Sequence, residues 1–132
     1  MTDTVHDPVN RPAHYQGKGL EAIQVIEDWE LGYHLGNAVK YILRAGKKGD
    51  RKQDLEKALW YVRRAKKFPE MFVAGPPRYE LPQVAEAFDL GSTEACALYQ
   101  IWKAKSAILV FEGYLGIAER HLEHLINEEL AP

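Results

Sequence analysis

Four polar side chains recur at intervals that suit the recognition of a phosphorylated ligand. Asn37, Lys40, Tyr41 and Arg44 are spaced i, i+3, i+4 and i+7, which places all four on one side of a helix. An ammonium and a guanidinium neutralise phosphate, an amide can read a base edge, and a phenol ring offers a stacking surface. The alternative is a solvated face with Tyr41 partly packed, and the spacing leaves both interpretations open.

A basic loop bracketed by glycines follows directly. Gly46-Lys47-Lys48-Gly49 leads into another predicted helix, and backbone N–H groups at such a turn bind anions. The Walker A pattern fails, because Tyr41 occupies its first glycine position and Lys48 its Ser/Thr position. Lys47 and Lys48 are therefore predicted as phosphate ligands outside a P-loop, unless the glycines serve turn geometry alone.

The following helix adds a carboxylate, a cation and an aromatic ring. Asp54 either holds Mg²⁺ and orients Lys57, or is a first-turn carboxylate favoured by the helix dipole. Lys57 is a candidate phosphate ligand. Trp60 could stack on a base or seal a helix interface, and we rank the interface first.

These residues are chemically adequate for phosphoryl transfer, which needs mainly positioning and charge stabilisation. Lys40 and Arg44 would neutralise the transferring phosphate and Asp54 would hold the metal, so that Mg²⁺ and ATP are the expected cofactors of a kinase. A resident metal is not predicted. The Glu27/Glu30 pair lacks the second acidic pair that helical pyrophosphatases need, and two histidines near the C-terminus lack a third ligand.

The net charge of −2 hides a segregated distribution. Residues 1–39 carry −4, residues 40–67 carry +8, and residues 68–132 carry −6. A basic block of this density suggests a phosphate-bearing small molecule, a polyanion or an acidic partner surface. The alternative is a solvated helical face paired with the chain's own acidic segments.

Apolar residues with helical periodicity must position these groups. They predict an all-α bundle of five or six helices, with an extended arm over residues 1–18, a helical unit over 19–67, a linker over 68–81 and a second helical unit over 82–132. The predicted helices span residues 20–29, 34–45, 50–67, 82–88, 93–105 and about 107–125, of which 107–111 is ambiguous between helix and strand. Asp50 and Gln53 resemble a capping box.

A weak internal repeat links the two helical units. The segments 24–45 and 83–104 are identical at eight of 22 positions, at an offset of 59. If this repeat is real, the fold consists of two three-helix units. The second unit then lacks the polar residues of the first, because Cys96, Tyr99 and Gln100 stand where Asn37, Lys40 and Tyr41 stand. Chance similarity of helical composition is the alternative.

Composition excludes several classes of protein. The single Cys96 cannot form an internal disulfide or a multi-cysteine zinc site. The longest apolar run has five residues, whereas a membrane span needs about 18. The first residues lack the features of a signal peptide. A reducing cytoplasm is the expected setting, and no membrane partner is expected.

Several motifs in a fixed order carry a family resemblance. They are Asp7-Pro8-Val9-Asn10 with His14-Tyr15, Glu21 with Val25-Ile26-Glu27-Asp28, Gly36–Tyr41, Arg44–Gly49, and Asp54-Leu55 with Lys57–Tyr61. Residues 7–65 thereby resemble a small bacteriophage family often labelled nucleotide kinase, after a podophage deoxynucleoside monophosphate kinase with a similar domain. Residues 68–132 match no pattern of that family.

The resemblance implies a phage protein that acts on nucleotides in the host cytoplasm as a homo-oligomer. By motif it marks His14, Tyr15, Asn37, Lys40, Tyr41, Arg44, Lys47, Asp54, Lys57 and Trp60 as family-typical positions. If the kinase uses groups beyond the shared domain, this chain would bind nucleotides without phosphorylating them.

Three functions stay open at this point. The first is a nucleoside monophosphate kinase without a P-loop. The second is a non-catalytic nucleotide binder, such as a sponge for a host immune signalling nucleotide. The third, ranked below both, is a DNA- or RNA-binding accessory protein that uses the basic block. The segregated charge favours a small phosphorylated ligand over a long polyanion.

Overall fold

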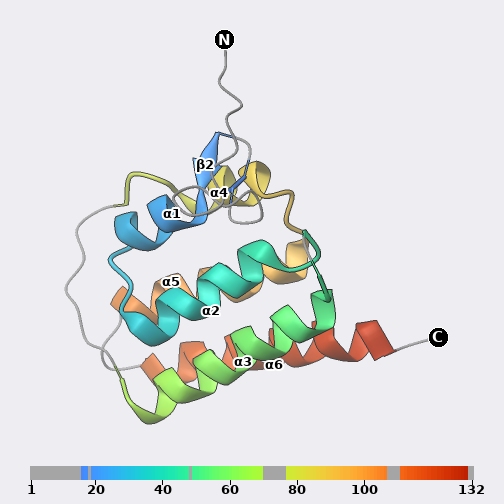
Figure 1. Cartoon of the computed structure of the whole chain (residues 1–132). Coiled ribbons are helices and arrows are strands. Elements are labelled where there is room, and N and C mark those ends of the chain that lie inside the picture. The colour runs from blue at the N-terminus through green and yellow to red at the C-terminus, as the bar shows by residue number, and fades with distance from the viewer. Residues whose placement is uncertain (1–15, 18, 48, 70–76, 107–110, 131–132) are drawn as a thin grey trace.

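The described part of the chain is helical, as expected. The computed structural model describes residues 16–17, 19–47, 49–69, 77–106 and 111–130. Within these ranges, six helices and one pair of two-residue strands occur (Figure 1). The helices are α1 (Ala22–Asp28), α2 (Tyr33–Arg44), α3 (Arg51–Lys67), α4 (Leu81–Ala87), α5 (Ser92–Ser106) and α6 (Phe111–Leu130). The predicted all-α bundle is thereby confirmed.

The start of the first helix differs from the prediction. Leu20 belongs to a strand, β2 (Leu20–Glu21), which pairs antiparallel with β1 (Gln16–Gly17). Gly19 makes the tight connection, because its φ of +75° is easily reached only by glycine. The helix then begins at Ala22 behind a capping box in which the Glu21 N–H donates to Gln24 Oε1 at 2.8 Å. Apolar periodicity alone cannot distinguish such a short strand from a first helical turn.

The predicted cap of α3 can be checked in the structure, whereas most of the predicted arm cannot. Asp50 caps the helix as predicted, since Asp50 Oδ1 accepts a hydrogen bond from the Gln53 N–H at 3.3 Å, which is one half of the predicted capping box. The predicted arm falls on residues 1–18, of which 1–15 and 18 lie outside the described residues. The ambiguous segment 107–111 also lies outside them except for Phe111, which begins α6.

The helices are arranged in layers. Figure 1 shows α1 and α4 at one end of the molecule, α2 and α5 in the middle, and α3 and α6 at the other end. Helices α2, α3, α5 and α6 pack on one another as a four-helix bundle. One apolar core runs through all layers, and its largest fully buried side chains are Trp29, Phe88, Leu35, Ile42, Leu43, Leu55, Leu98, Ile101, Leu115 and Leu122.

The internal repeat is visible in the helix bounds and in the turns. Helices α4 and α5 begin 59 residues after α1 and α2. A buried aromatic residue follows directly after α1 and after α4, Trp29 in the first case and Phe88 in the second. Each is followed by an acidic residue in the left-handed region, Glu30 with φ 51° and Asp89 with φ 53°. The same unusual turn at the same offset indicates two related units rather than chance composition.

The third helices repeat with one additional residue. Helix α6 begins 60 residues after α3. At this offset the buried positions coincide: Leu55 with Leu115, Ala58 with Ala118, Val62 with Leu122, and Ala65 with Leu125. The described chain therefore consists of α1–α2–α3 followed by α4–α5–α6, and the second unit has one more residue between the start of its second helix and the start of its third.

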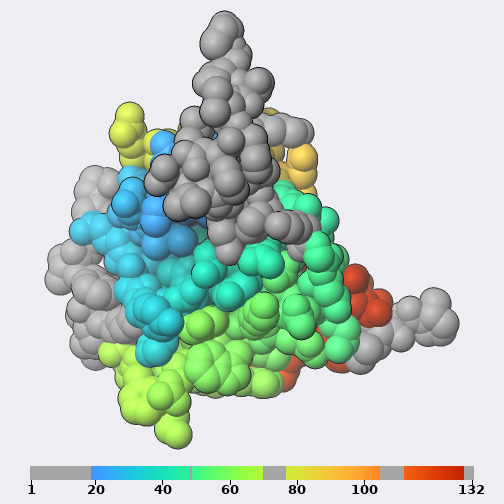
Figure 2. Space-filling model, viewed as in Figure 1, coloured from blue at the N-terminus to red at the C-terminus, as the bar shows by residue number. Residues whose placement is uncertain are grey.

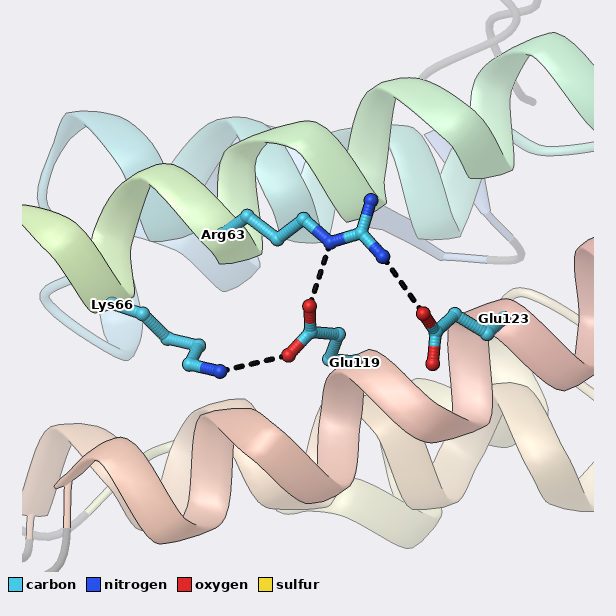
Figure 3. Close-up of polar contacts among 4 residues, drawn as sticks. All are labelled: Arg63, Lys66, Glu119 and Glu123. Carbon is cyan, nitrogen blue, oxygen red and sulfur yellow. Dashed lines mark hydrogen bonds and ion pairs between the residues drawn. The ribbon is translucent and has the colours of Figure 1, made fainter.

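The basic and acidic blocks meet where α3 packs on α6. Arg63 donates from Nε to Glu119 at 2.6 Å and from a terminal nitrogen to Glu123 at 2.7 Å. Lys66 donates to the second oxygen of Glu119 at 2.8 Å (Figure 3). Near the other end of α3, Arg51 donates to Glu94 of α5 at 2.6 Å. Part of the basic block is thus neutralised within the chain, as the alternative interpretation of the charge pattern expected.

This network should make stability depend on pH. Burial alone would raise the pKa of Glu119, but hydrogen bonds from Lys66 and Arg63 outweigh burial and hold the pKa below its ordinary 4.5. Its contribution is therefore complete above pH 4.5 and is lost as the pH falls through the lowered value. We expect Glu119→Gln to lower the free energy of unfolding by about 1 kcal/mol at pH 7, and by progressively less as the pH falls below 4.5.

Thermal unfolding followed by circular dichroism across this pH range tests the expectation. Glu56→Gln is the matched control, since Glu56 makes an exposed pair with Lys52 within α3. A Glu119→Gln penalty that persists undiminished at pH 2 would show that the network acts through packing rather than charge.

The helices were also compared with the length and apolarity that a bilayer requires. In the described ranges, none of them meets both requirements for a transmembrane span.

Candidate functional site

The predicted polar face of α2 meets α3 around the ring of Tyr41. Lys40 Nζ lies 4.7 Å from the ring centroid, Lys57 Nζ 5.3 Å and Arg44 Cζ 5.8 Å. Tyr61 of α3 stacks on the same ring, with centroids 6.0 Å apart and planes 12° apart. Two helices therefore place three cations around one aromatic ring. Lys40, Arg44, Lys57 and the stacked rings of Tyr41 and Tyr61 are named the Tyr41 cluster. Figure 2 shows α2 and α3 side by side on one face of the molecule.

Asp54 lies beneath this cluster. Its side chain is 2% exposed, and Oδ2 lies 3.5 Å from Arg44 Nε. It is the buried charged residue of the described core, and Oδ2 accepts no hydrogen bond there. It is buried because the first turn of α3 faces the last turn of α2, where Arg44 stands. This position favours an ion pair that orients Arg44 over a carboxylate presented to a metal.

A shallow groove adjoins the cations. It has a volume of about 290 Å³, and it lies between the end of α1 and the first turns of α2. Its lining includes Lys40, which also contacts the Tyr41 ring, so the groove is continuous with the cationic cluster. The remaining lining residues are Ile26, Leu31, Gly32, Tyr33, Gly36 and Asn37.

Gly36 allows α1 to approach α2 at this groove. A Cβ at position 36 would lie 3.2 Å from Ile26 Cγ2, closer than nearly all such contacts. Asn37 donates from Nδ2 to the Tyr33 carbonyl at 2.8 Å, which fixes the amide and directs its carbonyl oxygen as the acceptor available to a ligand. The groove is thus mainly apolar with one amide and one ammonium, a lining typical of small-molecule sites.

Exposed aromatic rings border the site. Tyr33 is 68% exposed and meets Tyr61 edge-on at 6.1 Å. A side-chain hydrogen bond with Tyr33, together with burial, raises the pKa of Tyr61. Trp60 is 56% exposed and meets Tyr61 edge-on at 5.0 Å. Trp60 therefore seals no helix interface within the described chain. The preferred prediction, that Trp60 packs between helices, is wrong for these residues.

Of the two loop lysines, the structure describes Lys47, which lies away from the cations around Tyr41. Lys47 lies over the Phe88 ring at 5.9 Å, near Asp89. Burial is the main cause that lowers the pKa of Lys47, and Asp89 partly offsets it. The reason is local, because Gly46 has φ +84° and turns the chain away from α2 toward α4. Lys48, His14 and Tyr15, also predicted as ligands, lie outside the described residues.

A metal site needs several His, Cys, Asp or Glu side chains close together. Within the described ranges, no cluster of three or more His, Cys, Asp or Glu side chains could hold a metal ion. Glu119 and Glu123, near the C-terminal histidines, contact Arg63 instead.

Sequence reasoning underestimated several contributors. Tyr33 could have been found, since it precedes Asn37 by four residues and Tyr41 by eight on one helical face. Tyr61 could have been found in the same way, since it follows Lys57 by four residues on one helical face. Ile26 and Leu31 carry no such signal, because they line the groove only through the close approach of α1 to α2 at Gly36.

Part of the chain is similar to a known protein family. Residues 9–63 match the model of the DUF3310 family, which is described as a protein of unknown function. No curated protein and no solved structure matches the chain. The match ends within α3, so it covers most of the first three-helix unit and leaves out the second. The first unit, which carries the Tyr41 cluster, is similar to the DUF3310 family.

Proposed function

We propose that the face formed by α2 and α3 binds a small phosphorylated nucleotide. The observation that supports this most directly is the placement of Lys40, Arg44 and Lys57 around the Tyr41 ring, within 4.7 to 5.8 Å of its centroid. Arg44 is paired with Asp54 at 3.5 Å, whereas Lys57 lies against the Tyr41 ring, so a bound anion would add a counter-charge on the Lys57 side of the ring. A phosphate group is the anion that ammonium and guanidinium groups bind best together.

Lys57 differs from the members of the basic block that are neutralised by α5 or α6. Arg51, Arg63 and Lys66 each contact a carboxylate of α5 or α6 at 2.6 to 2.8 Å. Lys57 has no carboxylate partner among the residues that the structure describes, and its ammonium lies against an aromatic ring instead. A ligand phosphate would provide the missing counter-charge.

The groove beside Lys40 suits the base of such a ligand. Tyr33 offers an exposed ring for stacking, the Asn37 carbonyl oxygen can accept from a base edge, and Ile26 provides an apolar floor. Lys40 lines the groove and also contacts Tyr41. A base in the groove therefore places its phosphate beside the three cations without a change in the backbone.

Phosphoryl transfer would require more of the site than nucleotide binding does. The resemblance to the phage family predicts a nucleoside monophosphate kinase, a homo-oligomer and the host cytoplasm as its setting, and these stay predictions. The buried Arg44–Asp54 pair supports binding more than transfer, since Asp54 as placed does not present its carboxylate to a metal. If transfer occurs, Mg²⁺ would have to be held mainly by the nucleotide phosphates.

Titration calorimetry with dGMP, dTMP, ATP and a cyclic dinucleotide tests the proposal. We expect at least one of them to bind, and Lys57→Ala to weaken that binding about tenfold, because a charged hydrogen bond contributes about 1.5 kcal/mol or more. Lys52→Ala removes the same charge from the same helix but from an exposed pair with Glu56, and it should change the affinity less than twofold.

Two outcomes would count against the proposal: no binding by any of the four ligands, or equal losses in the Lys57→Ala and Lys52→Ala variants. A parallel incubation of dGMP or dTMP with ATP and Mg²⁺ separates a kinase from a binder. Formation of the diphosphate would establish transfer, and tight binding without turnover would establish a non-catalytic role.

A further inference from the structure

A second group of exposed aromatic and cationic side chains continues along α3 beyond the Tyr41 cluster. Trp60 is 56% exposed and Phe68 is 46% exposed. The Arg64 guanidinium contacts both rings, with its Cζ 5.8 Å from the Trp60 centroid and 4.4 Å from the Phe68 centroid. Lys67 Nζ lies 5.7 Å from the Phe68 ring. The two exposed rings and the two cations therefore form one continuous surface group, and such exposed apolar groups mark interaction sites.

The register connects this group to the proposed nucleotide site. Lys57, Tyr61 and Arg64 are spaced i, i+4 and i+7, which places them along one side of α3, and Phe68 follows at the C-terminal end of the helix. At 1.5 Å per residue, this stripe is roughly 16 Å long. Bases in a stacked strand are about 3.4 Å apart, so the stripe spans several nucleotides rather than one.

The chemistry of the stripe also selects its ligand. Alternating rings and cations are what proteins use to bind single strands, in which bases stack on aromatic side chains and the backbone follows the positive charge. The acidic residues of α6 lie on another side of α3, where they pair with Arg63 and Lys66. The Arg64 side of α3 therefore keeps its positive charge for an anionic partner.

We infer that the Tyr41 cluster and the Trp60–Arg64–Phe68 group together bind a short single-stranded oligonucleotide. This inference builds on the proposed nucleotide site, where one nucleotide of the strand would be held by Lys57, while the following bases stack on Trp60 and Phe68. The phosphates between those bases contact Arg64 and Lys67.

Fluorescence anisotropy with end-labelled single strands of two, four and eight thymidines, and with the matching uridine strands, tests the inference. Affinity should rise with length and level off near four to five nucleotides. Trp60→Ala should weaken binding of the four-nucleotide strand roughly 5- to 150-fold and weaken dTMP binding by a much smaller factor. Arg64→Ala should also flatten the salt dependence by about 0.7 in slope. Arg120→Ala, which removes an exposed cation of α6, should change neither.

The possible outcomes separate this inference from the proposed function. If dTMP or another mononucleotide binds through Lys57 but longer strands bind no tighter, the oligonucleotide inference is overturned and the nucleotide site stands. If strands bind through Trp60 and Arg64 while no mononucleotide binds, the inference stands and the small-ligand function fails. If Trp60→Ala changes only the oligomeric state measured by light scattering, the stripe binds a second copy of the chain and the inference is overturned.

Discussion

We expect Trp29→Ala to lower the free energy of unfolding by about 4 kcal/mol, the usual cost of deleting a buried indole. Trp29 is 2% exposed, and its Nε1 donates to the Tyr79 carbonyl at 2.8 Å. That hydrogen bond links the end of α1 to the segment just before α4. A loss of this size is a large fraction of the total stability of a small protein, about 5–15 kcal/mol, so the variant should be partly unfolded at 37 °C.

Urea unfolding followed by far-ultraviolet circular dichroism measures this effect. Trp29→Phe places the residue of the second unit in the first, and it should cost less, about 2 kcal/mol, because it keeps most of the apolar contact and loses the hydrogen bond. Ile23→Ala on the same helix is the control, since Ile23 is 51% exposed and should cost less than about 1 kcal/mol. A Trp29→Ala cost no greater than that of Ile23→Ala would contradict the role of Trp29 in joining the two units.

Asp54→Ala has the second largest expected effect: it should lower the stability of the free protein and raise its affinity for a phosphorylated ligand. Without ligand, Asp54→Ala removes the buried carboxylate that pairs with Arg44 and should lower the free energy of unfolding by about 2 kcal/mol, which is below the range for fully buried pairs because Arg44 is 22% exposed. With the carboxylate gone, a phosphate meets a more positive site and binds more tightly. Ligand at about 100 times its dissociation constant adds about 2.7 kcal/mol, enough to restore the lost stability.

Melting temperatures with and without a saturating nucleotide reveal both parts of this prediction. Asp54→Asn keeps the shape of the side chain and isolates the effect of charge, so it should also gain affinity. If Asp54 instead holds Mg²⁺ for phosphoryl transfer, both variants would lose Mg²⁺-dependent nucleotide affinity, and the ion-pair interpretation would be wrong.

The polar face of α2 is the part of the candidate site that the sequence predicts best. Helical spacing alone placed Lys40, Tyr41 and Arg44 together, since positions three and four residues apart share a face. The cap at Asp50 was predictable for a similar reason, because its hydrogen bond reaches only three residues along the chain. Interactions of short sequence separation are encoded locally and can be recognised from one sequence.

The contacts that could not be predicted connect residues far apart in the chain. Arg63 and Glu119 are 56 residues apart, and nothing near Arg63 indicates that its charge is neutralised while that of Lys57 is not. The direction of Lys47 depends on the positive φ of Gly46, which spacing does not reveal. Which lysines of the basic block belong to the site is therefore decided by tertiary packing.

The repeated architecture has a consequence for how such a protein can evolve. Two similar three-helix units within one chain are held at high effective concentration, so their pairing does not depend on protein concentration. A pair of identical subunits would have to use one sequence on both sides of the contact, whereas a duplicated and fused unit can diverge. Here the second unit carries Glu119 and Glu123, which neutralise Arg63, and the first unit carries the cluster around Tyr41. Because the described residues form this cluster at the α2–α3 position, a saturating titration should find one nucleotide per chain.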